Sequence, residues 1–184
     1  ILAIEYKLKS KWKKNQKRGP IPVAFKPREV IQMDTVSFGF IFAFTAVDIF
    51  SKDVSVELHP SLTSHDGAEF LKRSFSSRFH HTDLLQTDGG PEFKDQFRRS
   101  VFQYADRFRV ARPYRKNEQA YIESFNRTLR KECLGWGQFK DWQIPTLQRE
   151  VDEYLVYYHA QRAHLGLNLR TPNDILREYK VSDI

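Results

Sequence analysis

The apolar residues in the first half of the chain fall in short runs of strand length, separated by turn residues. Three such runs occupy residues 30–36, 40–49 and 54–58, and Val, Ile and Phe predominate in them. Gly39 and the cluster from Ser51 to Asp53 supply the turns. The pattern predicts a meander of three strands.

Helical and strand patterns alternate in the rest of the chain. A strand meander followed by this alternation indicates an α/β layer fold. The expected elements are a helix at 63–79 capped by Thr63, a strand at 83–87, a helix from Pro91 to about Tyr104, a strand at 108–111, helices at 117–134 and 145–159, and a last helix starting at Thr171-Pro172.

The helix expected at residues 117–134 has one narrow apolar stripe. At 3.6 residues per turn, the stripe consists of Ile122, Phe125, Leu129 and Cys133. Asn117 can cap the start of this helix, and Gly135 is placed to end it. We therefore expect Cys133 to pack in the core rather than to act as a nucleophile.

Glu123 lies about 100° around this helix from the apolar stripe. Amide and arginine residues surround it within two turns: Gln119, Asn126, Arg127 and Arg130. One interpretation is an exposed glutamate paired with Arg127 at i+4. The other is a carboxylate that holds a metal ion next to a phosphate chain.

Two aspartates upstream favour the second interpretation. Asp34 falls inside a predicted strand, where an unpaired carboxylate is costly to desolvate, so it needs a metal ion or a basic partner. Asp88 ends the strand at 83–87, and two glycines follow it, which allows a tight turn close to a ligand. Because sites gather at strand ends in α/β sheets, we expect Asp34, Asp88 and Glu123 to converge.

Converging carboxylates repel one another unless cations neutralise them. Hard oxygen ligands with open positions suit Mg²⁺ or Mn²⁺. Two such ions can activate a water or hydroxyl and stabilise the leaving oxygen of an in-line phosphoryl displacement. Spacing alone leaves the simpler interpretation of Glu123 open.

The composition limits both the class of fold and the kind of molecule that the protein binds. The 184-residue chain has 40% hydrophobic residues, 15 of them Phe, which is enough for a packed α/β domain. Its formal charge of +7 points to a polyanionic partner. A single cysteine excludes an internal disulfide and a Cys-rich zinc site. The longest apolar run, residues 38–47, is too short to span a membrane.

Residues 1–20 are rich in Lys and Arg and contain one acid, Glu5. They form either a solvated tail or a basic arm along a nucleic-acid backbone, in which Lys11, Lys13 and Lys14 would contact phosphates. We divide the chain into a basic arm (1–20), an α/β core (21–140) and a C-terminal helical extension (141–184). Since Ile1 is not an initiator methionine, we expect the chain to be a piece of a longer protein.

Three segments carry a more specific signal. They are IQMDTV, QTDGGPEF and YRKNEQAYIESFNRTLRKECL. In that order they resemble the catalytic motifs of the retroviral-type integrase core, which bacterial insertion-sequence transposases share. The 34 residues between Asp88 and Glu123 are close to the family's spacing. The later segment YYHAQRAHLGLNLRTPNDIL is similar to the one that follows the core in bacterial members.

This resemblance implies an RNase H-like fold with a mixed five-stranded sheet and extra C-terminal helices. It implies DNA cutting and joining by Asp34, Asp88 and Glu123 with two Mg²⁺ or Mn²⁺ ions. Gly89, where the family often has Asn, and a spacing one residue shorter than the commonest form are departures, and neither removes a metal ligand. The DNA contacts that we expect on the helix are Asn126, Arg127, Arg130 and Lys131.

The resemblance also implies partners. These are the ends of a mobile element, its target DNA and further copies of the chain, with no membrane. The DNA-binding domain that usually lies upstream is absent from this sequence, and so is a secretion signal. A bacterial host would imply a cytoplasmic, nucleoid-associated location. The competing functions are a metal-dependent RNase H-like nuclease and an inactive DNA-binding module.

Three further acids lie outside the three motif positions. Glu92 either orients Asp88 or caps the helix that begins near Pro91. Asp48 and Asp53 are interpreted as turn residues at the ends of predicted strands.

Overall fold

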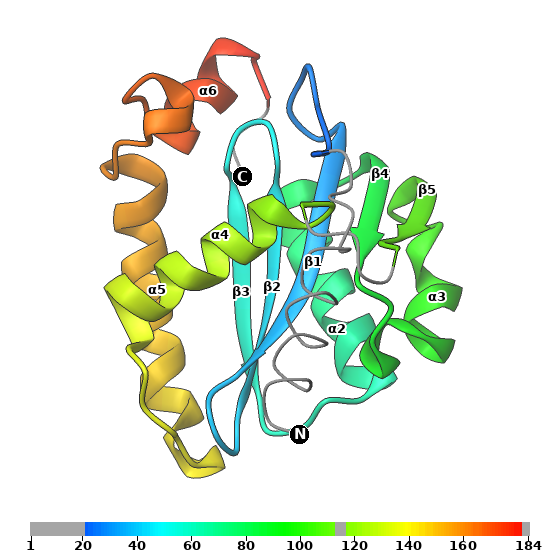
Figure 1. Cartoon of the computed structure of the whole chain (residues 1–184), viewed down its shortest axis with the longest axis vertical. Helices are drawn as coiled ribbons and strands as arrows, with labels where there is room; N and C mark the ends of the chain where they lie inside the picture. The colour runs from blue at the N-terminus through cyan, green and yellow to red at the C-terminus, as the bar shows by residue number, and fades with distance from the viewer. Residues whose placement is uncertain (1–20, 113–116, 182–184) are drawn as a thin grey trace, which may run out of the picture.

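The computed structural model describes residues 21–112 and 117–181. Its centre is a mixed five-stranded sheet in the order β3-β2-β1-β4-β5 (Figure 1). Strands β1, β2 and β3 pair antiparallel, whereas β4 and β5 run parallel to β1. The strands are β1 Val30–Ser37, β2 Phe42–Asp48, β3 Val54–His59, β4 Thr82–Thr87 and β5 Ala105–Val110. The expected meander and mixed sheet are confirmed.

Helices cover both faces of this sheet. The helices α4 and α5 pack on one face and α2 and α3 lie on the other (Figure 1). The α-helices are α2 Ser64–Ser74, α3 Asp95–Val101, α4 Ala120–Leu129, α5 Ile144–Ala160 and α6 Pro172–Glu178. Short π-helical turns extend two of them, η1 Phe75–Phe79 and η3 Arg130–Leu134, and 3₁₀ turns occupy η2 Pro91–Phe93, η4 Asp141–Gln143 and η5 Leu165–Leu167.

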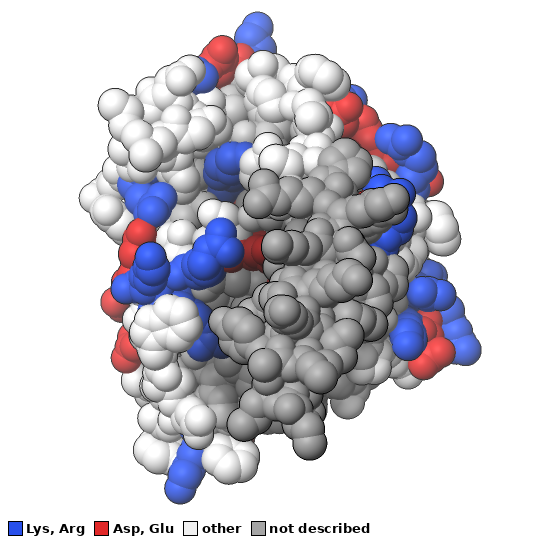
Figure 2. All heavy atoms as spheres, viewed as in Figure 1, with Lys and Arg blue, Asp and Glu red and all other residues white. Residues whose placement is uncertain are grey.

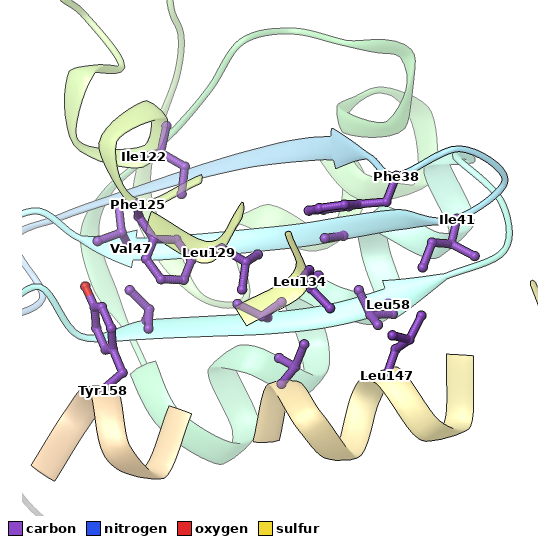
Figure 3. Close-up of a cluster of buried hydrophobic side chains, with 14 of the residues drawn as sticks. Phe38, Ile41, Val47, Leu58, Ile122, Phe125, Leu129, Leu134, Leu147 and Tyr158 are labelled. Atoms are coloured by element: carbon purple, nitrogen blue, oxygen red, sulfur yellow. The ribbon is translucent and has the colours of Figure 1, made fainter. Parts of the chain in front are cut away.

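Each face of the sheet has its own hydrophobic core. Alternate residues of β2 divide between the two: Val47 packs with α4 and α5, and Phe44 packs with α2. Figure 3 shows the first core, where Leu129 of α4 and Leu147 of α5 approach the same strands. The second core is dominated by buried phenylalanines of the helical segments: Phe70, Phe75, Phe79, Phe93 and Phe97.

Two helix starts follow the predicted signals. The side chain of Thr63 caps α2 in a reciprocal box with Asp66, and Thr171 caps α6 in the same way with Asp174. Pro172 occupies the start of α6, as expected. The continuous helix predicted from Pro91 to Tyr104 is wrong. It is broken at Lys94, which has an extended backbone, into η2 and α3.

The helix that carries Glu123 differs from the prediction at both ends. Gln119, not Asn117, occupies the N-cap, and the φ of +86° at Asn117 places that residue outside the helix. At the other end, η3 inserts a π-helical turn, which shifts the phase of the buried stripe. The stripe therefore passes from Leu129 to Leu134, five residues on, and Cys133 is only half-buried. Gly135 ends the helix, with a φ of +72° that favours glycine.

Asp48 is the last residue of β2 and Asp53 ends the turn before β3, but both side chains are fully buried, so interpreting them only as turn residues was incomplete. The Asp53 carboxylate lies 2.7 Å from Arg28, 3.2 Å from His159 of α5, and also pairs with Arg78 of η1. Burial alone would raise the pKa of Asp53, but these neighbours together lower it below its ordinary value. One carboxylate thus joins helical segments from both faces of the sheet to the hairpin.

Candidate active site

Asp34 lies in β1 opposite Thr45 of β2 and is half-buried beneath α4. Its Oδ2 accepts a 2.8 Å hydrogen bond from Nδ2 of Asn126, and the Thr45 hydroxyl donates to the other end of that amide, also at 2.8 Å. The sequence proposed Asn126 as a DNA contact. In the structure its buried amide holds Asp34 against α4.

Asp88 and Glu123 lie on elements adjacent to Asp34. Strands β1 and β4 are parallel neighbours with Gln32 opposite Gln86, and each aspartate comes two residues later in its chain segment. Asp88 therefore follows the carboxyl end of β4, where its Oδ1 accepts a 2.8 Å hydrogen bond from the Gly90 amide. Glu123 is in the first turn of α4, and its side chain is exposed, like that of Asp88.

The pKa of Asp34 depends on charges carried by the neighbouring elements. Burial is the largest influence and raises its pKa, and a hydrogen bond that the carboxylate accepts from the backbone of Thr35 opposes that effect. The negative charges of Asp88, Glu92 and Glu123 raise it further, to about 7. Asp34 is thus a carboxyl group close to three other acids.

A pair of buried glutamines fixes the start of α4 to the strands of both aspartates. The Gln32 amide of β1 donates to the carbonyl of Glu118 at 2.7 Å and accepts from the Ile122 amide at 3.1 Å. Gln86 of β4 donates to the same Glu118 carbonyl at 3.1 Å. Glu123 follows Ile122 directly. The strands that carry Asp34 and Asp88 therefore also fix the position of the first turn of α4, which carries Glu123.

Glu118 adds a second anchor before α4. Its side chain is buried and pairs with Arg109 of β5 at 2.9 Å and with Arg112 at 2.6 Å. Burial would raise its pKa, but hydrogen bonds from Arg112 and the two arginine charges lower it below its ordinary value. Sequence analysis missed Gln32, Gln86 and Glu118. The available signal was a glutamine two residues before each aspartate, in strands otherwise apolar.

Glu92 contacts a neighbour of Asp34 in β1 and the loop that follows Asp88. Its Oε1 accepts a 2.7 Å hydrogen bond from the hydroxyl of Thr35, the neighbour of Asp34. A side chain at Gly90, in the loop after Asp88, would collide with the Glu92 carboxyl group, since a Cβ there would lie 2.4 Å from Oε2. Glu92 lies in the first turn of η2, as the capping interpretation expected. It is also a buried acid that connects the Asp34 strand with the Asp88 loop.

Within residues 21–112 and 117–181, no group of three or more His, Cys, Asp or Glu side chains is arranged closely enough to hold a metal ion. The donor chemistry nevertheless fits Mg²⁺ or Mn²⁺, because Asp34, Asp88 and Glu123 offer hard oxygens. The Asp34 side chain accepts a hydrogen bond from a neutral amide, and burial together with the charges of the neighbouring acids raises its pKa, so a bound cation would stabilise its charged form. Exposed side chains at Asp88 and Glu123 can rotate toward it.

The basic residues predicted as DNA contacts have different surroundings. Arg127 and Lys131 are exposed on α4 and η3, whereas Arg130 is half-buried and donates to the Ser37 carbonyl at 2.7 Å. Figure 2 shows Lys and Arg side chains gathered over the face where α4 lies. Lys11, Lys13 and Lys14 lie outside the described residues. No helix of the described part of the chain is long and apolar enough to cross a membrane.

Similarity to known protein families identifies the family of this chain. A family described as the integrase core domain matches residues 24–116, and a second family of the same description matches residues 105–172. The chain belongs to the integrase core domain family. The resemblance inferred from the three acidic motifs is thereby confirmed.

Two insertion-sequence proteins are relatives of this integrase core. An uncharacterized 31.7 kDa protein of insertion element IS407 from Burkholderia multivorans is 27% identical over 157 residues, which covers 82% of this chain and 54% of the relative. The transposase of IS904 from Lactococcus lactis is 26% identical over 93 residues, 50% of this chain and 36% of the relative. The chain thus spans about half the length of the first relative and about a third of the second.

Solved structures show the same fold. The catalytic core of HTLV-2 integrase in complex with magnesium superposes with a TM-score of 0.64 at 16% identity, covering 83% of this chain and 99% of that one. The catalytic core of BIV integrase gives 0.62 at 19% identity, covering 83% and 96%. A chain of the simian T-cell lymphotropic virus intasome with PP2A B56 gamma gives 0.71 at 18% identity, covering 91% and 60%. The RNase H-like integrase core fold is confirmed.

Proposed function

We propose that this integrase core is the catalytic part of a DDE-type transposase or integrase that cuts and joins DNA strands. The observation that carries the proposal is the position of Asp34. It is half-buried, hydrogen-bonded to the helix of Glu123, and close enough to Asp88 and Glu123 for both charges to raise its pKa. Neighbouring carboxylates repel one another, and a bound cation would remove that repulsion.

Asp34, Asp88 and Glu123 would hold two Mg²⁺ or Mn²⁺ ions. When bound, such ions activate a hydroxyl nucleophile and stabilise the leaving oxygen of a phosphodiester. The protein orients the ligands: Asn126 holds one oxygen of Asp34, the Gly90 amide holds one oxygen of Asp88, and the glutamine pair fixes the start of α4. Such positioning contributes to the rate because each ligand is already near its productive geometry.

DNA is the proposed substrate, since the formal charge is +7 and exposed basic side chains flank the acids. Arg127 and Lys131 would contact phosphates next to the reacting one, and Lys11, Lys13 and Lys14 would add sequence-independent affinity. The same proposal specifies the DNA as the ends of a mobile element and its target. It also includes self-assembly of the chain into an oligomer and a bacterial cytoplasmic location. Dimeric and trimeric forms of the related HTLV-2 core support self-assembly.

A hydrolytic nuclease is the second candidate, because the same acids could direct water at a phosphodiester. The test incubates the chain with labelled donor ends that carry a free 3′-hydroxyl, a target duplex and Mg²⁺. Joined products support transfer, whereas cut products alone support the nuclease. Binding without either product would support an inactive DNA-binding module.

The same assay tests the residues. Asp34→Asn, Asp88→Asn and Glu123→Gln should each reduce joining to background while DNA binding persists, since each removes a charged metal ligand. Glu153→Gln, an exposed acid of α5, is the matched control and should join at the wild-type rate. Full joining by any one of the three acid variants would remove that residue from the site.

A further inference from the structure

A hollow of about 430 Å³ lies beyond the C-terminal end of α4, between the β1–β2 turn and the segment after η3. Its walls come from residues 37–40 and 136–138, with Arg130 between them. Backbone hydrogen bonds join the two walls: the Phe40 amide to the Phe139 carbonyl at 2.9 Å and the Phe139 amide to the Phe38 carbonyl at 2.7 Å. The hollow is therefore built from segments that are fixed to each other.

Two large aromatic side chains line this hollow and remain exposed. Phe40 is 68% exposed and Trp136 is 71% exposed, whereas neighbouring Phe38 is buried in the core. What distinguishes these two rings from other exposed aromatic residues of the chain is that both line the same hollow. Exposed rings on a basic protein are suited to stacking on nucleobases, because every base has an aromatic face.

Arg130 gives the hollow a positive charge. Its guanidinium lies 4.3 Å from the centre of the Phe38 ring and 5.4 Å from that of Trp136, and donates to the Ser37 carbonyl. Within the described residues, that carbonyl is its one recorded hydrogen-bond acceptor. Other guanidinium N–H groups can therefore donate to a phosphate while the ring contacts hold the side chain in place.

The hollow lies within reach of the acids along two elements. Ser37 follows Asp34 by three residues of extended strand, roughly 10 Å. Arg130 follows Glu123 by seven helical residues, again roughly 10 Å. At a rise of about 3.4 Å per base pair along the axis of a duplex, this distance corresponds to about three nucleotide positions.

We propose that Trp136 and Phe40, with Arg130, form a subsite that binds an unpaired nucleobase and its phosphate, about three nucleotides from the acids. This inference rests on the proposed function for its substrate, DNA. A paired base has both faces covered by its neighbours, so the base must leave the duplex to stack here. Stacking makes the subsite tolerant of base identity, and the phosphate contact places the strand relative to Asp34 and Glu123.

The test compares Trp136→Ala with Trp142→Ala. Trp142 is the matched control, since it is 73% exposed on η4 but does not line the hollow. The probe is a fluorescein-labelled duplex with a single-stranded overhang, and binding is followed by anisotropy without divalent metal. Trp136→Ala should weaken Kd by roughly fivefold or more, Trp142→Ala should not, and Trp136→Phe should recover part of the loss.

A second perturbation separates stacking from general loss of binding. Replacing overhang nucleotides one at a time by an abasic site should weaken wild-type binding at one position. At that position the wild type and Trp136→Ala should bind alike, because the base that the ring contacts is gone. Equal losses for the two tryptophan variants, or a Trp136 effect that persists at every abasic position, would overturn the proposal. So would a Trp136→Ala variant that alters self-association but binds the probe normally.

This result is independent of the joining assay. Joining without Trp136-dependent binding would retain the proposed function and reject the subsite. Trp136-dependent binding without joining or cutting would retain the subsite and reject the function. Absence of any DNA binding by the wild-type chain would overturn both.

Discussion

The side-chain oxygen of Gln32 accepts a 3.1 Å hydrogen bond from the backbone amide of Ile122, across 90 residues of sequence. The other end of the same side chain donates to the carbonyl of Glu118, so a single buried residue of β1 holds the backbone on either side of the first helical turn of α4. Asp34 follows Gln32 by two residues and Glu123 follows Ile122 directly. The strand of Asp34 and the helix of Glu123 are therefore joined by the Gln32 side chain, in addition to the hydrogen bond from Asn126 to Asp34.

Replacing Gln32 by Leu should separate positioning from ligation. The variant leaves the Ile122 amide and one bond of the Glu118 carbonyl unsatisfied in a buried place, which costs roughly 2–4 kcal/mol of unfolding free energy. The rate of joining at saturating DNA should fall because Glu123 is no longer held in position, whereas the affinity for DNA should stay unchanged. Urea unfolding and single-turnover joining measure the two effects.

Gln86→Leu is the control for that variant, because it removes a 3.1 Å bond to the same Glu118 carbonyl and a long 3.5 Å bond from Gln32, but leaves the bond to the Ile122 amide in place. Its effect on both quantities should be smaller. If Gln32→Leu loses stability but joins at the wild-type saturated rate, the glutamine pair supports the fold and has no part in placing Glu123.

Neutralising the buried Asp53 should cost more stability than neutralising an exposed acid. Asp53→Asn leaves Arg28 and Arg78 without a buried counter-charge, and we expect a loss of about 3–5 kcal/mol in unfolding free energy. Asp83→Asn removes an exposed pair with Lys26 and should cost less than about 1 kcal/mol. Chemical unfolding of both variants tests this, and similar losses would contradict the structural role given to Asp53.

His164 should make the protein less stable in mild acid. It is buried against Tyr158, with ring centres 4.7 Å apart, and burial together with the Arg162 charge lowers its pKa to about 4 from an ordinary 6.5. The unfolded chain takes up this proton near pH 6.5 and the native protein only near pH 4. Stability is therefore complete above about pH 6.5 and is lost progressively as the pH falls toward 4, by roughly 2–3 kcal/mol.

His164→Gln cannot take up that proton. Its melting temperature should fall less steeply than that of the wild type between pH 6.5 and 4.5, with a constant difference between the two proteins above pH 7. Parallel curves over the whole range would show that His164 is not the group responsible.

The fold could be predicted, and the three acids could be assigned to their strands and helix, because these signals are local. The strand of Asp34 and the turn after Asp88 are visible as apolar runs and glycines, and the ordered motifs identify the family. The helix of Glu123 was predicted with the correct stripe as far as Leu129. Beyond that residue the prediction failed, because a π-helical turn changes the spacing from four residues to five and no single-sequence periodicity contains that change.

The supporting groups could not be predicted because their partners are distant in sequence. Asp53 resembles any turn aspartate until Arg28, Arg78 and His159 surround it. Likewise, Gln32 resembles an ordinary polar residue in a strand, and its importance appears only when α4 packs against it. Burial of a polar side chain depends on which distant groups satisfy it, and that is fixed by the tertiary structure.

The central claim is that Asp34, Asp88 and Glu123 converge on divalent metal ions. Anomalous diffraction from crystals of the chain soaked in Mn²⁺ tests it most directly. The account predicts an anomalous peak about 2.0–2.2 Å from carboxylate oxygens of both Asp34 and Asp88, with Glu123 turned toward it, and loss of that peak in Asp34→Asn. A well-ordered site with no peak at millimolar Mn²⁺, or a peak that persists in Asp34→Asn, would contradict it.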